Sequence, residues 1–234
     1  MKTPELVETG LLGADLGGQR HIPLSAESGG LANSPDLRTG ASWRETLLAA
    51  ARLKLVLGAT RKVVTVTCFN AADGGSILSA RVASGLAEID KGNVLLLDAN
   101  VAASQLGRLF GVENSPGLQE VLEERLEVKD ALRPLEPSNL WMLPLGRVNG
   151  SLSSLLTSSH CAQVIDELRK QFRFIVVDTG FVNSPESVLL ASLSDGVLLA
   201  LAAGARTKDE VAGFQEELRR LRIPLLGVML TTKS

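Results

Sequence analysis

Carboxylates that follow apolar runs, and a hydroxyl beside two glycines, are the side chains in this sequence best suited to chemistry. Asp98 and Asp178 end the runs NVLLLD and FIVVD, while Gly74, Gly75 and Ser76 separate a third apolar run from a helical pattern. Backbone N–H groups at a glycine turn and a helix N-terminus bind anions, and carboxylate and hydroxyl oxygens suit Mg²⁺. These residue types therefore point to phosphate chemistry.

The turn around Gly74 is an incomplete phosphate-binding loop. A complete loop reads G-x-x-x-x-G-K-[ST], and its frame here runs from Phe69 to Ser76. The second glycine and the hydroxyl are present, but Gly75 stands in place of the lysine. The predicted cofactor-binding residues are Asp73, Gly74, Gly75, Ser76 and Ile77. Asp98 and Asp178 are the predicted catalytic acids, and Ser76 with Asp178 would hold Mg²⁺ if nucleotide binds.

Loss of the lysine should weaken both binding and catalysis. Its charge-assisted contact to phosphate is worth about 1.5–3 kcal/mol, or about 10- to 150-fold in affinity. Losing a preorganised donor costs about 10²–10³ in rate. Lys62 and Lys91 are expected at the far end of the sheet, and Arg81, one turn or more into the helix, would have to fold back to replace the lysine. With the backbone cradle expected to survive, weak ATP or ADP binding with Mg²⁺ is predicted, without efficient phosphoryl transfer.

Apolar strands alternate with amphipathic helices along the rest of the chain. The predicted strands are 63–67, 93–98, 139–143, 174–178, 196–201 and 225–230. Helical spacing marks 76–89, 118–126, 164–172 and 207–221, the last with a capping box at Thr207 and Glu210. This order predicts an α/β fold, with a mostly parallel sheet covered by helices on both faces. Ligands of such sheets bind at the carboxyl ends of the strands, where the loop, Asp98 and Asp178 converge.

A further helix is predicted from Ser42, which can act as its N-cap. Apolar residues recur at every fourth position and are expected to face the domain. They are Trp43, Leu47, Ala51 and Leu55. The opposite side carries Arg44, Arg52 and Lys54. That side is either a solvated face or part of a subunit contact.

Composition bounds the class of protein. The 234 residues suit one domain, predicted at 42–234, behind a flexible polar tail at 1–41. With 24 basic and 26 acidic residues the net charge is −2, which gives no reason to expect nucleic acid as a partner. The single cysteines Cys68 and Cys161 are expected to be buried hydrophobes, and His21 and His160 lie too far apart in the chain to indicate a metal site.

The expected location is cytoplasmic. The segment MKTPELVETG has no apolar signal-peptide core, and the longest apolar run, 197–203, is far shorter than a membrane span. Direct membrane insertion is therefore not expected, and any association with the inner membrane would go through a partner.

From about residue 34 onward the sequence resembles the bacterial tyrosine autokinases (BY-kinases) of capsule and exopolysaccharide assembly. These belong to the MinD/ParA-like P-loop ATPases, which have a three-layer architecture. KVVTVTCFNAADGGS stands where the family has its Walker A loop, NVLLLDANVAASQLGRLFGVENSPGLQEVL its Walker A′ segment, and FRFIVVDTG its Walker B strand. The phrase LGRLFG…SPGLQEVL is the most specific part of the resemblance.

Some of the family's functional residues are present in this sequence and others are replaced. Gly74, Ser76, Asp98 and Asp178 match the loop glycine, the Mg²⁺-binding hydroxyl and the Walker A′ and Walker B acids. Several family residues are replaced at the same crevice. The replacements are Gly75 for lysine, Asn100 for the second Walker A′ acid, Ala102 and Ala103 for an arginine pair, and Thr231 for a base-contacting asparagine. Of the family's E-x-x-R-x-x-R oligomerisation motif only Arg52 remains, and the sequence contains no tyrosine.

The resemblance implies a catalytically degenerate member of the family that acts as a binding or regulatory subunit in polysaccharide synthesis and export. The implied partner is the cytoplasmic segment of a membrane polysaccharide co-polymerase, or a kinase subunit. Homo- or hetero-oligomers are compatible with this role. The main alternative is a slow ATP-dependent tyrosine kinase or ATPase of the same system, and a second is a cell-positioning ATPase.

Overall fold

The computed structural model describes residues 22–23, 41–60 and 62–231. Most of the predicted 1–41 tail therefore lies outside the described residues. Within that tail, Ile22–Pro23 forms the short strand β1, which pairs in parallel with Met229 and Leu230. No helix in the described part of the chain is long and apolar enough to cross a membrane.

The described residues form a sheet of eight strands in the order β1-β8-β7-β2-β6-β3-β5-β4. All pairs are parallel except β4 with β5. Besides β1, the strands are β2 Val63–Cys68, β3 Val94–Asp98, β4 Arg133–Pro134, β5 Leu140–Leu143, β6 Phe174–Phe181, β7 Val197–Ala202 and β8 Leu225–Thr231. The predicted mostly parallel α/β sheet is confirmed, because continuous apolar strands are buried on both faces.

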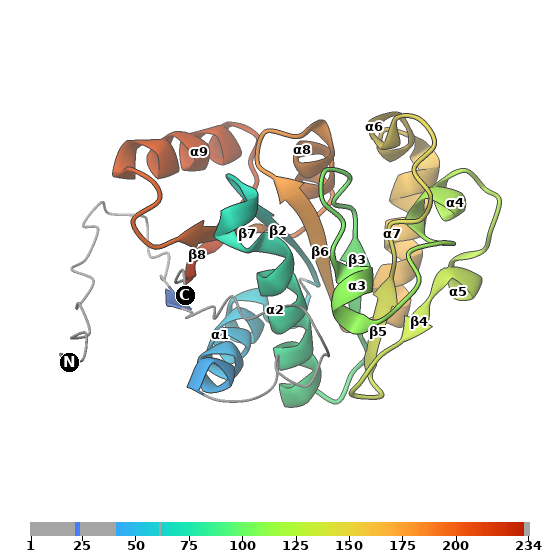
Figure 1. Cartoon of the computed structure of the whole chain (residues 1–234), viewed down its shortest axis with the longest axis horizontal. Coiled ribbons are helices and arrows are strands. Elements are labelled where there is room, and N and C mark those ends of the chain that lie inside the picture. The colour runs from blue at the N-terminus through green and yellow to red at the C-terminus, as the bar shows by residue number, and fades with distance from the viewer. Residues whose placement is uncertain (1–21, 24–40, 61, 232–234) are drawn as a thin grey trace.

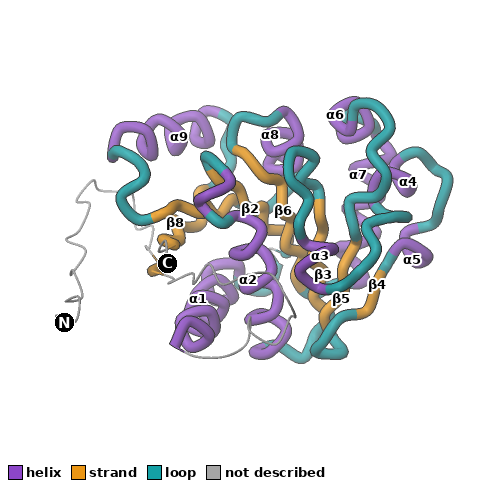
Figure 2. Tube along the Cα trace, in the orientation of Figure 1, coloured by secondary structure: helices purple, strands orange, loops and turns teal. Residues whose placement is uncertain are grey.

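Helices cover both faces of the sheet, as Figures 1 and 2 show. On one face α1 Ala41–Leu57, α2 Gly75–Ile89 and α3 Leu106–Phe110 pack over one apolar core. The other face carries two further clusters of buried side chains. Its helices are α4 Leu118–Leu122, α5 Val128–Ala131, α6 Leu152–Leu156, α7 Ser159–Gln171, α8 Pro185–Ser192 and α9 Lys208–Arg220. The predicted capping box of Thr207 and Glu210 at the start of α9 is present.

Helix α1 corrects one prediction. Leu55, predicted to face the domain, is 79% exposed, whereas Leu53 is 2% exposed. Helix α1 packs on α2 through small side chains, since a Cβ on Gly85 would lie 3.0 Å from Cβ of Ala50 and 3.1 Å from Cγ2 of Thr46. Thr46 and Ala50 therefore make the close contact with α2, rather than the residues that were predicted to face the domain. Leu48 and Leu55 therefore remain at the surface.

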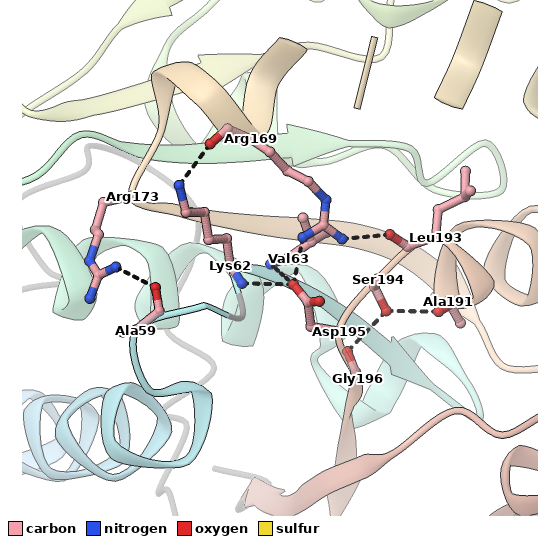
Figure 3. Close-up of polar contacts among 10 residues, drawn as sticks. All are labelled: Ala59, Lys62, Val63, Arg169, Arg173, Ala191, Leu193, Ser194, Asp195 and Gly196. Carbon is pink, nitrogen blue, oxygen red and sulfur yellow. Dashed lines mark hydrogen bonds and ion pairs between the residues drawn. The ribbon is translucent and has the colours of Figure 1, made fainter. Parts of the chain in front are cut away.

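At the entry to the sheet, the carboxylate of Asp195 holds the first residues of the central strand β2. Its Oδ2 accepts hydrogen bonds from the backbone N–H groups of Lys62 (2.7 Å) and Val63 (2.8 Å) and from Nη1 of Arg169 (2.8 Å). Nζ of Lys62 donates in turn to the Arg169 carbonyl at 2.9 Å (Figure 3). This network joins β2, α7 and the start of β7. It also places Lys62 at the end of the sheet away from the predicted loop, as predicted.

Candidate functional site

Parallel pairing brings the two predicted catalytic acids together. Asp98 ends β3 and lies directly opposite Asp178 of β6 in the strand register. Ser76, in the first turn of α2, joins them through Asn100, whose Nδ2 donates to Ser76 Oγ at 3.3 Å. The carboxyl ends of β3 and β6 and the start of α2 therefore form one crevice, at the edge of the sheet where parallel α/β proteins bind ligands.

Both carboxylates are fully buried, and their protonation reflects this. Burial raises the pKa of Asp98 to about 6, against the hydrogen bonds from Ser104 Oγ (2.7 Å) and the N–H of Asn100 (3.0 Å). Burial, and then the charge of Asp98, raise the pKa of Asp178 to about 7. Oδ2 of Asp178 has no hydrogen-bond partner in the described part of the chain. The crevice thus places two buried carboxylates opposite each other, and burial disfavours the charged form of both.

The loop between β2 and α2 differs from the expected open cradle. Residues Ala71–Asp73 form a 3-10 turn, and three successive backbone N–H groups of the loop have acceptors inside it. The N–H of Ala72 donates to Asn70 Oδ1 (2.9 Å), that of Asp73 to the Asn70 carbonyl (3.1 Å), and that of Gly74 to the Ala71 carbonyl (3.2 Å). The N–H groups of Ala72, Asp73 and Gly74 are therefore engaged inside the loop rather than free. A phosphate could reach these donors only after the turn unwinds.

Asp73 anchors the turn to neighbouring strands. Its buried carboxylate accepts from the N–H of Asn70 (2.9 Å) and from the N–H of Ala202 at the end of β7 (3.0 Å). The hydroxyl of Thr231, at the end of β8, donates to the Asp73 carbonyl at 3.1 Å. Thr231 stands where the resemblance places a base-contacting asparagine, and here its hydroxyl is engaged by the loop itself.

Gly75, at the position of the missing lysine, packs against strand β2. A Cβ atom on Gly75 would lie 3.0 Å from Sγ of Cys68 and 3.4 Å from its Cβ. Cys68 is buried, and burial together with the charges of Asp178 and Asp73 raises the pKa of its thiol to about 12. The thiol is therefore a packing group, as predicted, and any side chain at position 75 would press against it.

The cavity at the loop has a volume of about 40 Å³. Small-molecule sites usually measure about 300–1,000 Å³. None of the described residues that line the cavity is basic. They are Cys68, Ala71, Gly74, Gly75, Ser76, Ile77, Asn100, Ala103, Gln105 and Phe181. Its size and lining do not match a triphosphate.

One cation near the loop has no counterpart in the sequence predictions. The guanidinium of Arg206 lies 5.0 Å from the ring centroid of Phe69, just before the 3-10 turn. Its Nη1 donates to Oε1 of Glu210 at 2.9 Å. Arg206 follows β7 in sequence by only four residues, and no motif marks it, so only the fold reveals that it lies near the loop. Both contacts hold it outside the cavity.

The oxygen atoms present in the crevice suit a magnesium ion better than they suit a nucleotide. Ser76 Oγ and Oδ2 of Asp178 are oxygen ligands of the type that Mg²⁺ prefers. Within the described residues, however, no group of three or more His, Cys, Asp or Glu side chains could hold a metal ion. A bound Mg²⁺ would neutralise phosphate charge, but the phosphates that complete its coordination do not fit the closed loop.

Cys161 and His160 lie away from this crevice, in the first turn of α7. Cys161 is buried, and burial raises the pKa of its thiol to about 11. Nε2 of His160 lies 3.2 Å from the Val121 carbonyl. Because a carbonyl oxygen only accepts, Nε2 carries the hydrogen in this contact. Neither residue joins the predicted site.

No protein-family model matches the chain. The tyrosine-protein kinase CpsD of Streptococcus pneumoniae serotype 4 is 27% identical over 171 residues, which cover 72% of this chain and 75% of that kinase. The putative tyrosine-protein kinase CapB of Staphylococcus aureus is 26% identical over 170 residues, covering 72% and 74%. The tyrosine-protein kinase ptk of Acinetobacter johnsonii is 28% identical over 135 residues, and the match spans 58% of this chain but only 18% of that protein.

Solved structures share the fold. The kinase domain of the Escherichia coli tyrosine kinase ETK superposes with a TM-score of 0.83 at 18% identity, over 92% of this chain and 91% of that domain. The cell division ATPase MinD of Pyrococcus furiosus gives a TM-score of 0.61 at 20% identity, over 72% and 71%. The predicted relationship to bacterial tyrosine kinases and the MinD-like P-loop fold are therefore confirmed.

Proposed function

We propose that this chain is a catalytically degenerate relative of the bacterial tyrosine kinases that acts as a binding or regulatory subunit in capsule or exopolysaccharide synthesis. The observation that carries the proposal is the state of the loop. Three of its N–H groups are satisfied internally, and Gly75, in place of the lysine, packs against Cys68. The fold is retained, but the lysine is absent and these three N–H groups are engaged within the loop.

The energetics of the crevice support a loss of catalysis. A transferring phosphoryl group is stabilised mainly by cations and oriented donors. Here the buried carboxylates of Asp73, Asp98 and Asp178 surround the loop, and the cavity has no basic residue in its described lining. Bringing in a polyanion would add like charge to a site that already disfavours charge, as the raised pKa of Asp178 indicates. The lost lysine contact alone is worth about 10²–10³ in rate.

The proposed partner follows from the family resemblance. A neighbour in fold bears the description "chimerical protein CapA2B2", with a TM-score of 0.82 at 20% identity. We infer that the partner of this chain is the cytoplasmic segment of a membrane polysaccharide co-polymerase, or an active kinase subunit. Because the sequence contains no tyrosine, phosphorylation of its own tyrosines has no part in this role.

A second candidate function is a slow tyrosine kinase or ATPase that acts on a partner. The arrangement of Ser76, Asp98 and Asp178 favours it, because the hydroxyl and both acids remain together. An induced opening of the loop by a partner would be required before a triphosphate could enter.

Phosphoryl transfer separates the two candidates. The purified chain, alone and mixed with the cytoplasmic segment of the co-polymerase encoded nearest to it, is incubated with radiolabelled ATP, Mg²⁺ and a tyrosine-containing polymer. The proposed function predicts a stable complex with the segment and no transfer above the level of the Asp98→Ala variant. Transfer that Asp98→Ala abolishes would establish the kinase instead, and absence of a complex would remove the proposed partner.

A further inference from the structure

A cavity of about 430 Å³ lies between the segment that joins α4 to α5 and the flank of α7. These elements lie side by side at one end of the molecule in Figure 1. They cover the face of the sheet opposite to α1 and α2, so the cavity is separate from the phosphate loop. Its volume falls within the range of about 300–1,000 Å³ that is usual for binding sites.

The floor of this cavity is apolar. Val121, Val128 and Val164 line it and are between 2% and 5% exposed, and the half-buried Leu126 adjoins them. A floor of this kind favours the aliphatic part of a ligand, because it offers no polar group to water. His160 forms part of the wall and is held by the contact of its Nε2 with the Val121 carbonyl.

The rim of the cavity has an excess of negative charge. Both basic residues in the lining are already paired, Lys129 with Glu127 at 2.6 Å and Arg125 with Glu123. Glu124 and Glu167 remain as carboxylates without a cation among the described residues, and Glu167 accepts only from the neutral amide of Gln171. An apolar floor below two uncompensated carboxylates suits a side chain that joins an aliphatic stem to a cation.

We propose that this cavity, lined by Val121, Glu124, Val128, His160, Val164 and Glu167, binds an arginine side chain presented by a partner polypeptide. The stem lies on the valines, and the guanidinium donates to the carboxylates of Glu124 and Glu167. Arginine is preferred to lysine because its planar head offers five donors to two carboxylates at once. The inference goes beyond the proposed function and does not depend on the state of the phosphate loop.

The test is a titration of the full chain with the capped tripeptide acetyl-Val-Arg-Val-amide, followed by NMR of valine and leucine methyl groups. The matched ligand carries citrulline, which has the same shape as arginine but no charge. We expect saturable shifts of the Val121, Val128 and Val164 methyls, with the citrulline peptide about 10-fold weaker. No saturation up to millimolar peptide, shifts elsewhere, or equal affinity of the two peptides would overturn the proposal.

Substitutions in the protein test which carboxylates bind the arginine peptide. Glu124→Gln and Glu167→Gln should each weaken the arginine peptide by about threefold, as expected for partly exposed ion pairs, and leave the citrulline peptide unaffected. Glu113→Gln removes an exposed carboxylate outside the cavity and should change nothing. An equal loss in Glu113→Gln would show attraction by overall charge and overturn the site. The peptides are titrated without ATP or Mg²⁺, so the outcome of this test is independent of the outcome for the proposed function.

Discussion

A Cβ atom on Gly75 would lie 3.0 Å from Sγ of Cys68, so a side chain at the position of the missing lysine would press against the end of strand β2. Cys68 is buried, and its Sγ donates to the Gly180 carbonyl at 3.5 Å. A side chain at position 75 would therefore require Cys68 to shift by a few tenths of an ångström.

This relationship predicts a coupling between the two positions. Gly75→Lys should be tolerated better, by about 1 kcal/mol in the free energy of unfolding, when Cys68→Ala is also present, since residues in contact are not additive. Urea denaturation of the wild type, both single variants and the double variant measures this term. Gly213→Lys is the matched control, because a Cβ there meets nothing within 4 Å. If the effect of Cys68→Ala added to that of Gly75→Lys as completely as to that of Gly213→Lys, Cys68 would not be the residue that obstructs a side chain at position 75.

The buried Asp178 predicts a dependence of stability on pH. Its pKa is about 7 in the folded protein and about 3.9 in the unfolded chain, so the folded state binds more protons between these values. The free energy of unfolding should fall as the pH rises from about 4 to about 7, by an amount on the order of 2–4 kcal/mol.

Asp178→Asn should remove this part of the slope and be more stable than the wild type at pH 8. Chemical denaturation at pH 5 and pH 8 provides the measurement. Asp166→Asn, which changes an exposed carboxylate on α7, is the control and should follow the wild type. If the wild type gained stability relative to Asp178→Asn on going to pH 8, the carboxylate would have to be compensated by a cation.

Asp73 should determine how firmly the loop is closed. Asp73→Ala removes the acceptor for the N–H groups of Asn70 and Ala202 and leaves both donors unsatisfied. We expect a loss of about 2–4 kcal/mol in the free energy of unfolding and faster hydrogen exchange at Ala72 and Gly74. The exposed Asp209 offers a control in Asp209→Ala. Unchanged exchange in Asp73→Ala would mean that the turn does not depend on this anchor.

Asp195 should contribute to the stability of the fold by holding the start of strand β2. Asp195→Ala removes the acceptor for two backbone N–H groups at the start of β2 and for Nη1 of Arg169 in α7, and a loss of about 1–3 kcal/mol in the free energy of unfolding is expected. Glu216 pairs with Arg219 and Arg220 on the exposed side of α9, and Glu216→Ala should change stability little. Thermal or urea unfolding that ranks the two variants in the opposite order would contradict the role of Asp195.

Regular elements were predictable where one local pattern determines them. Apolar runs such as NVLLLD form buried strands wherever they occur in such a sheet, and the acids at their ends therefore lie at the same edge. Helix α1 was predictable in extent but not in orientation. Its contact with α2 depends on how closely Gly85 lets Thr46 and Ala50 approach, which is a property of two helices and not of one.

The shape of the loop could not be predicted for a similar reason. The donors that anchor it lie far away in sequence, since the Asp73 carboxylate accepts from the N–H of Ala202 and the Asp73 carbonyl accepts from the hydroxyl of Thr231. The motif indicated which residues form the loop and that Gly75 replaces a lysine. It did not indicate that the N–H groups turn inward, because the motif does not specify Asn70 and Asp73, whose capping box forms the turn.

Calorimetric titration with ATP and Mg²⁺ tests the central claim, that the retained fold no longer grips a triphosphate. With Gly75 packed on Cys68 and the N–H groups of the turn engaged, we predict no saturable heat and a Kd weaker than about 0.1 mM, for the wild type and for Asp98→Ala alike. Micromolar affinity accompanied by hydrolysis that Asp98→Ala abolishes would contradict the account.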